Sequence, residues 1–136
     1  MHYLNSLDAI NTSNKRFKDF IQGNSKDQLP PSGTFLYVDV RDVALAHVKA
    51  IEVPEAGNQR FFITAGYFTN RDIVDSILES HPQLESKLPP KDAPRDLPSG
   101  IYGYDNRKSI DVLGLKYQPF KKTVGDTIES LLAVGA

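Results

Sequence analysis

The fold of this chain is decided by residues 34–47, which read Thr34-Phe35-Leu36-Tyr37-Val38-Asp39-Val40-Arg41-Asp42-Val43-Ala44-Leu45-Ala46-His47. The first five are β-branched, aromatic or aliphatic, which predicts a strand. Asp39 follows as a helix N-cap, with Asp42 three residues later as its capping-box partner. Apolar residues then recur at helical spacing and predict an amphipathic helix that ends near Glu52. A strand that leads straight into a helix is typical of α/β folds.

A second strand is predicted over residues 60–64, after Pro54 and Gly57 have stopped the helix. Its run Arg60-Phe61-Phe62-Ile63-Thr64 is largely apolar, which favours burial on both faces. Strand, helix and strand in succession over residues 34–64 predict a parallel pair with a right-handed crossover. Two short strands make a poor sheet alone, so we expect them to belong to a larger α/β sheet.

The N-terminal segment predicts a helix over residues 7–21. Asn5 or Ser6 can cap it, because their side chains accept hydrogen bonds from the free N–H groups of the first turn. Gly23 is the expected C-terminal stop. One position breaks the apolar stripe of this helix, since Asn14 stands where an apolar residue is expected.

The second half of the chain predicts helices separated by a proline-rich coil. A helix over residues 68–81 is followed by an extended coil over residues 82–104, and residues 105–136 hold a short helix and a final helix. Each of these three helices begins at a capping signal. Thr69 with Asp72 opens the first, Asp105 opens the short helix, and Thr123 with Asp126 opens the last.

The composition limits the possible functions. The chain has 136 residues, the size of one domain, and its 16 basic and 17 acidic residues give a formal charge of −1. This balance argues against a broad basic surface for nucleic acid or anionic lipid. The lack of cysteine excludes disulfides and thiolate chemistry, and no apolar run reaches the roughly 18 residues of a membrane span. We therefore expect a cytoplasmic protein with no nucleic-acid or membrane partner.

The polar residues of the central unit favour structural roles. Asp39 and Asp42 are expected to cap the helix, and Arg41 can pair with either carboxylate. His47 lies on the apolar stripe and is expected to be a buried, hydrogen-bonded imidazole. The three histidines share no metal-binding spacing, so we expect no metal site.

Further pieces accompany residues 35–47 in a fixed order along the chain. These are Asn11-Thr12-Ser13, Phe68-Thr69-Asn70-Arg71-Asp72-Ile73, Asp105-Asn106-Arg107-Lys108-Ser109 with Leu113-Gly114, and Thr123 with Asp126-Thr127. The ordered set resembles the C-terminal part of the extended short-chain dehydrogenase/reductase superfamily. It is most similar to the dihydroflavonol-reductase-like branch, which includes fungal NADPH-dependent methylglyoxal and carbonyl reductases.

The resemblance does not extend to the nucleotide-binding half of that family. The dinucleotide fingerprint needs closely spaced glycines after a strand, and the nine glycines here form no such cluster. The family's catalytic serine and its Tyr-x-x-x-Lys pair lie earlier in its sequence. Two such spacings occur here, Tyr104 with Lys108 and Tyr117 with Lys121, but the first tyrosine precedes its helix and Pro119 interrupts the second. We expect no catalytic residue in this chain.

The resemblance implies cofactor contacts in the Asn-Thr-Ser piece. In similar enzymes its serine lies beside the cofactor phosphates, so Ser13 is the first candidate, with Asn11 and Thr12 beside it. A hydroxyl or amide there can donate to phosphate oxygens. The alternative is a solvated helix face with no ligand.

Substrate contacts are expected at Tyr3, Leu4 and Tyr37. Tyr3 and Leu4 would follow the family's cofactor-side loop and line the substrate cleft, although a frayed terminus is the alternative. Tyr37 alternates with Phe35 on the predicted strand, so one of the two rings can face a cleft while the other faces the core.

The implied fold class is α/β, a single C-terminal substrate-binding lobe without the Rossmann half. In the intact enzyme this lobe and one wall of the cofactor cleft would serve the NADP(H)-dependent reduction of a small aldehyde or ketone. Alone, the chain is expected to be inactive and to bind the cofactor only weakly. Its parts are a cofactor-side helix (1–22), strand-helix-strand (34–64), a helix (68–81), a proline-rich coil (82–104) and terminal helices (105–136).

Two other functions stay open at this point. A free-standing binding or assembly module would self-associate through the apolar surface that the missing half normally covers. The lobe of a nucleotide-sugar epimerase or dehydratase would clamp a pyrophosphate with basic residues, for which Arg95, Arg107 and Lys108 are candidates.

Overall fold

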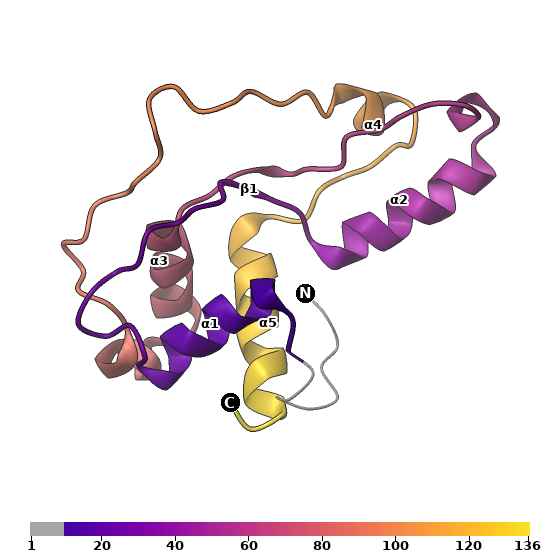
Figure 1. Ribbon diagram of the computed structural model, residues 1–136. Helices are drawn as coiled ribbons and strands as arrows, with labels where there is room; N and C mark the ends of the chain where they lie inside the picture. The colour runs from indigo at the N-terminus through magenta and orange to yellow at the C-terminus, as the bar shows by residue number, and fades with distance from the viewer. Residues whose placement is uncertain (1–9) are drawn as a thin grey trace.

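The computed structural model describes residues 10–136 and is rich in helix (Figure 1). Helices α1, α3 and α5 form one body, while α2 extends away from it beyond the strands (Figure 1). No helix in residues 10–136 has the length and apolar character needed to cross a bilayer. The elements in chain order are α1 (Thr12–Gln22), β1 (Leu36–Tyr37), α2 (Val40–Glu52), η2 (Pro54–Ala56), β2 (Gly66–Tyr67), α3 (Asn70–Ser80), η3 (Pro82–Lys87), α4 (Arg107–Asp111) and α5 (Phe120–Ala133).

The two strands pair antiparallel, so the predicted parallel pair is wrong. Leu36 faces Tyr67 and Tyr37 faces Gly66. The predicted second strand, residues 60–64, is extended, but residues 60–63 make no backbone hydrogen bond within the described chain. A strand, a helix and a strand in succession form a parallel pair only when both strands lie in one sheet. Residues 60–63 have no neighbouring strand within the described chain, so that pair does not form. Pairing starts only where Ala65 N donates to Tyr37 O.

Helix α1 begins at Thr12, later than the predicted residue 7. Asn11 is its N-cap, and its Oδ1 accepts a hydrogen bond from Asn14 N at 3.0 Å. A strong cap at Asn11 sets the start of this helix; the caps proposed earlier in the sequence, Asn5 and Ser6, lie outside the described residues. Gly23 ends the helix in the left-handed conformation (φ 81°), as predicted.

Two of the predicted capping boxes are replaced by long-range contacts. Asp39 caps α2, but the Asp42 carboxylate turns away and accepts from Gln118 N. Helix α5 starts at Phe120 after Pro119, so Thr123 lies inside it and donates to Asp39 instead of capping. Both side chains find partners about 80 positions away along the chain, Gln118 just before α5 and Asp39 just before α2, and local spacing cannot reveal these.

The remaining boundaries follow the sequence more closely. The Thr69–Asp72 box opens α3 as predicted, with both reciprocal hydrogen bonds present, and α3 ends before His81. Asp105 Oδ1 accepts from Arg107 N at the start of α4. The predicted coil 82–104 differs at its beginning, because its first six residues form the short helix η3.

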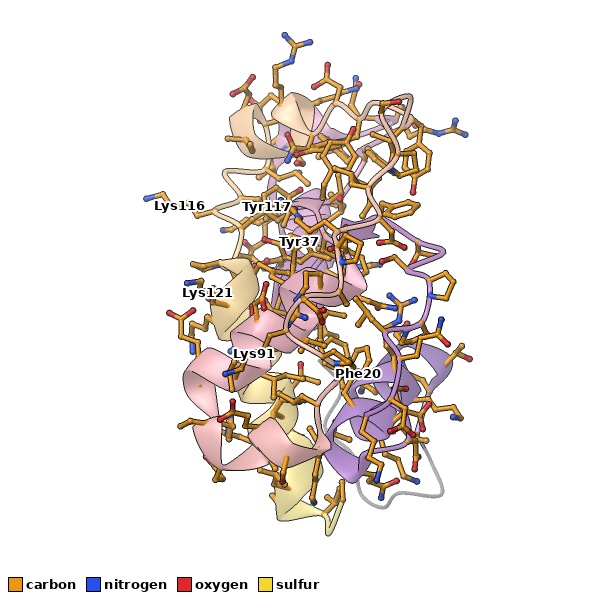
Figure 2. All side chains as sticks on the ribbon, turned by 90° about the vertical axis from the view of Figure 1, so that its left-hand side faces the viewer. Phe20, Tyr37, Lys91, Lys116, Tyr117 and Lys121 are labelled. Atoms are coloured by element: carbon orange, nitrogen blue, oxygen red, sulfur yellow. The ribbon has the colours of Figure 1, made fainter. Side chains whose placement is uncertain are left out.

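The core is divided into two apolar clusters. The larger one joins α1, α3, η3 and α5 and includes the fully buried Phe20, which lies between the helices in Figure 2. The smaller one gathers Ala46, Ala56, Leu113 and Leu115 beside α2. His47 is exposed, so the prediction that it is buried is wrong. The buried face of α2 is formed by Asp42 and Ala46, and His47 lies off that face.

Candidate functional site

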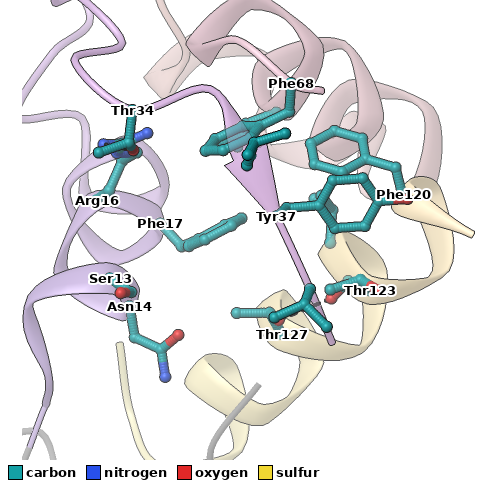
Figure 3. A pocket seen from close by; sticks show the side chains of 14 residues that line it. Ser13, Asn14, Arg16, Phe17, Thr34, Tyr37, Phe68, Phe120, Thr123 and Thr127 are labelled. Atoms are coloured by element: carbon teal, nitrogen blue, oxygen red, sulfur yellow. Dashed lines mark hydrogen bonds between the residues drawn. The ribbon is translucent and has the colours of Figure 1, made fainter. Parts of the chain in front are cut away.

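A cavity of about 270 Å³ opens between α1, β1 and α5 (Figure 3). Phe17 reaches into it from α1, and Phe68, Tyr37 and Phe120 stand together on the opposite side (Figure 3). The cavity therefore has an apolar, aromatic wall and a polar edge on α1, the usual make-up of a site for a small organic ligand. The lining residues fall into two groups, the polar Ser13, Asn14, Arg16, Thr34, Thr123 and Thr127, and the apolar or aromatic Phe17, Leu36, Tyr37, Val38, Phe68, Ile73, Phe120 and Val124.

The three residues of the Asn-Thr-Ser piece lie in three different settings. Ser13 lies in the first turn of α1, is exposed and lines the cavity. Asn11 is occupied as the helix cap, and Thr12 lines a different surface pocket and not this cavity. Within residues 10–136 no hydrogen bond engages the Ser13 hydroxyl, which leaves it able to donate to a bound oxygen. Thus one of the three predicted cofactor residues faces the cavity.

Tyr37 forms part of the aromatic wall, as the alternation on its strand allowed. Its ring meets Phe120 edge-on with the centroids 4.8 Å apart, and Phe68 at 6.4 Å. Its hydroxyl donates to Gln118 O at 3.4 Å. Burial, with smaller effects from Asp42, Tyr104 and Asp39, raises the pKa of Tyr37, so the phenol stays protonated. Tyr3 and Leu4 lie outside the described residues.

Arg16 closes the α1 side of the cavity. Its guanidinium lies 5.6 Å from the centre of the Phe68 ring, and Nη2 donates to Ser32 O at 2.9 Å. Ser32 is in turn held by Asp96, whose carboxylate accepts from Ser32 N at 2.7 Å. Burial lowers the pKa of Arg16, against the opposing charge of Asp96; the side chain nevertheless stays charged at any ordinary pH.

The Asp39 carboxylate ties α2 to α5 behind the aromatic wall. It is fully buried and accepts from Arg41 and from Thr123 Oγ1. Burial opposes its ionisation, but these hydrogen bonds outweigh that effect and hold the pKa of Asp39 well below its usual range. Arg41 also reaches Asp126 on α5 at 2.6 Å. Asp39 and Arg41 thus have the structural role that the sequence favoured for them, since they join α2 to α5.

Neither Tyr-x-x-x-Lys spacing forms a pair on a helix. Tyr117 precedes α5 and its hydroxyl contacts Ser109 Oγ at 2.7 Å, while Lys121 points outward and pairs with Glu79 (Figure 2). Tyr104 precedes α4 and stacks edge-on with Tyr67 instead of meeting Lys108. The described residues also contain no group of three or more side chains arranged to hold a metal ion.

Sequence reasoning missed most of the cavity wall. The local sequence pattern gives no sign that Phe17, Phe68 or Arg16 line a cavity, although all three do. Thr123 and Thr127 belong to a piece that carried the family resemblance, which was the one available signal. Their hydroxyls are already used, toward Asp39 Oδ2 and Thr123 O respectively.

Known proteins resemble this chain over most of its length. No protein-family model matches it. Ketoreductase azaE of Aspergillus niger is 47% identical over 131 residues, 96% of this chain and 39% of azaE. NADPH-dependent methylglyoxal reductase GRE2 of Saccharomyces cerevisiae is 32% identical over 127 residues, 90% of this chain and 36% of that protein.

Solved structures agree with this relationship. The crystal structure of Candida albicans Gre2 in complex with NADPH matches with a TM-score of 0.80 and 30% identity, over 94% of this chain and 38% of that one. The chain corresponds to the C-terminal part of an extended short-chain dehydrogenase/reductase. The chain spans between 36% and 39% of the length of these relatives. The expected family and fold class are confirmed, apart from the direction of strand pairing.

Proposed function

We propose that this chain, residues 1–136, is the substrate-binding lobe of an NADPH-dependent carbonyl reductase and forms one wall of its cofactor cleft. The observation that carries the proposal is that Ser13 and Tyr37, expected on the cofactor and substrate sides, line one cavity. The relatives named above are a ketoreductase and a methylglyoxal reductase, and cinnamoyl-CoA reductase 2 of Arabidopsis thaliana is 31% identical. Each of the three names describes a reductase that acts on a carbonyl compound.

The polar edge of the cavity suits the phosphate part of NADPH. Ser13 offers a hydroxyl that no other group of residues 10–136 engages, in the first turn of α1, where the helix dipole also favours an anion. Arg16 adds a positive charge one turn later along the same helix. When bound, NADPH supplies the hydride for carbonyl reduction. Ser13 would hold the cofactor in place and take no part in proton transfer.

The aromatic wall suits the apolar part of a carbonyl substrate. Tyr37, Phe68 and Phe120 present ring edges and faces that remove such a group from water. The described residues offer no acid–base pair at this wall, so the proton for the carbonyl oxygen would come from the nucleotide-binding half of the enzyme. This arrangement supports a lobe that binds and orients, and we expect no turnover from the chain alone.

Exposed apolar surface supports a covering partner for α2. Leu45, Val48 and Ile51 follow each other every three residues along α2 and are 43%, 48% and 87% exposed. Phe62, 52% exposed, lies in the extended segment 60–63, whose backbone makes no hydrogen bond with any other part of residues 10–136. Such a surface is normally covered in a folded protein. We infer that the nucleotide-binding half of the enzyme covers it.

The same surface supports the second candidate function, self-association of the isolated chain. An unpaired extended segment and an apolar helix face can pair with a second copy when no larger partner is present. Light scattering on the purified chain tests this directly. A monodisperse monomer at high concentration would exclude self-association and leave the lobe proposal untouched.

A chimaera tests the main proposal. In it, this chain replaces the matching 39% of ketoreductase azaE, to which it is 47% identical. We expect NADPH oxidation that depends on added carbonyl compound, measured beside azaE itself as the control. A folded chimaera that oxidises no NADPH with any compound reduced by azaE would contradict the proposal. The isolated chain, assayed in parallel, is expected to show no turnover.

A further inference from the structure

We propose that Asp42 is a positioning residue of the cavity, which holds the backbone of Gln118 and thereby sets the Tyr37 and Phe120 rings. The inference rests on the proposed function, because it assigns a role to a residue behind the proposed substrate wall. Asp42 itself does not line the cavity. It would act on the substrate through the residues that do.

The first step is the contact between Asp42 and Gln118. Asp42 Oδ2 accepts a hydrogen bond from Gln118 N at 2.9 Å, between residues 76 positions apart. Asp42 is buried, with 3% of the residue exposed, so water does not compete for this bond. A hydrogen bond to a charged acceptor is stronger than one between neutral groups. The bond therefore fixes where the chain enters α5.

The second step is the contact between Gln118 and Tyr37. The carbonyl oxygen of Gln118 accepts a long hydrogen bond of 3.4 Å from the Tyr37 hydroxyl, so residue 118 is held at its N–H by Asp42 and contacts Tyr37 through its C=O. Asp42 also raises the pKa of Tyr37, after the larger effect of burial. This keeps the phenol protonated and able to donate. The tyrosine hydroxyl is thus anchored to a backbone that Asp42 places.

The third step leads to the other ring. Pro119 follows Gln118 with φ −59° and serves as the N-cap of α5, which begins with Phe120. Because the proline ring fixes this dihedral angle, a shift of Gln118 is passed on to Phe120. The Phe120 ring meets Tyr37 edge-on at 4.8 Å, and both line the cavity. One carboxylate therefore governs two neighbouring parts of the aromatic wall.

Other roles for Asp42 are already filled. Asp39 provides the cap of α2, and Arg41 is engaged by Asp39 and Asp126. Burial and the nearby charge of Asp39 raise the pKa of Asp42, so keeping a carboxylate here works against stability. What the Asp42 side chain visibly does is accept from Gln118 N. An asparagine could make the same bond with its Oδ1 and without the charge.

The azaE chimaera described above tests the inference by steady-state kinetics. We expect Asp42→Ala to raise the KM for the carbonyl compound about tenfold, because the variant loses one hydrogen bond to a charged group. Both kcat and the KM for NADPH should stay within twofold of the parent values. Asp42→Asn keeps an acceptor and should restore the KM to within about threefold of the parent. Asp126→Ala is the matched control, because it removes a carboxylate from the same joint without contacting Gln118.

A structural readout keeps the test independent of turnover. In NMR spectra of the 136-residue chain, Tyr37→Phe identifies the Tyr37 ring signals. Asp42→Ala should shift those signals, while Asp42→Asn and Asp126→Ala leave them in place. Unchanged Tyr37 signals in Asp42→Ala, or an unchanged carbonyl KM in an active chimaera, would overturn the inference. An inactive parent chimaera counts against the proposed function alone, and the NMR result then decides the role of Asp42.

Discussion

Thr123 of α5 donates its hydroxyl hydrogen to the buried carboxylate of Asp39 at the start of α2, across 2.8 Å. The two residues are separated by 84 positions in the sequence. Their bond lies behind the aromatic wall and joins the helix that carries Phe120 to the helix that follows Tyr37. The wall of the cavity is therefore held in place by a carboxylate that does not itself line the cavity.

Replacing Asp39 with asparagine should lower the free energy of unfolding by about 2 kcal/mol at pH 7, the usual loss for a hydrogen-bonded buried charge. Its hydrogen bonds hold the pKa of Asp39 below that of the unfolded chain. The stabilisation is thus present above the unfolded pKa of about 3.9 and is lost as the pH falls below it. Urea unfolding at several pH values checks this. A stability difference between the variant and the wild type that stays constant from pH 7 to pH 3 would contradict it.

Replacing Ser13 with alanine in the azaE chimaera should raise the KM for NADPH about tenfold, because one charge-assisted hydrogen bond is lost. The KM for the carbonyl compound and the melting temperature should stay near those of the parent. Thr12→Ala is the matched control, since Thr12 neighbours Ser13 but does not line the cavity. Equal NADPH KM values for the two variants would remove Ser13 from the cofactor side.

Replacing Thr69 with alanine should destabilise the chain by about 1 kcal/mol through loss of the α3 cap. Both hydrogen bonds of the capping box join Thr69 to Asp72. Thermal or urea unfolding measures the change, with Ser99→Ala in the exposed coil as the control. An equal effect of the two substitutions would show that the box adds nothing to stability.

Replacing Ile51 with lysine should reduce self-association of the isolated chain. Ile51 is the most exposed large apolar residue of α2, and a charge there opposes the burial of Leu45 and Val48 against another surface. Light scattering over a range of protein concentrations should give a lower mean mass for the variant. Lys49→Ala, which alters charge elsewhere on α2, should not produce this decrease.

Local signals predicted the helices better than the sheet. The Thr69–Asp72 box and Gly23 act between neighbouring residues, so their spacing alone was sufficient. The direction of strand pairing depends on partners far along the chain, and β1 and β2 share just two residue pairs. Thr123 shows the same limit, because a threonine three residues before an acidic residue also fits a helix interior when Asp39 lies opposite.

The sequence named two of the residues that line the cavity, Ser13 from the family resemblance and Tyr37 from the alternation on its strand. Their roles toward cofactor and substrate stay predictions. Phe17 and Phe120 were missed because an aromatic residue on a helix face looks the same in sequence whether it meets the core or a cavity. Only the packing of α1 against α5 decides that question.

The separation of the core into two apolar clusters also has a consequence for hydrogen exchange. The cluster beside α2 contains four buried residues and leaves one face of that helix in solvent, while α3 buries six of its own residues. Amide protons of α2 should therefore exchange for deuterium through local opening well before those of α3. Docking of the remaining enzyme onto α2 would slow that exchange, which makes the deuterium pattern a direct report of assembly.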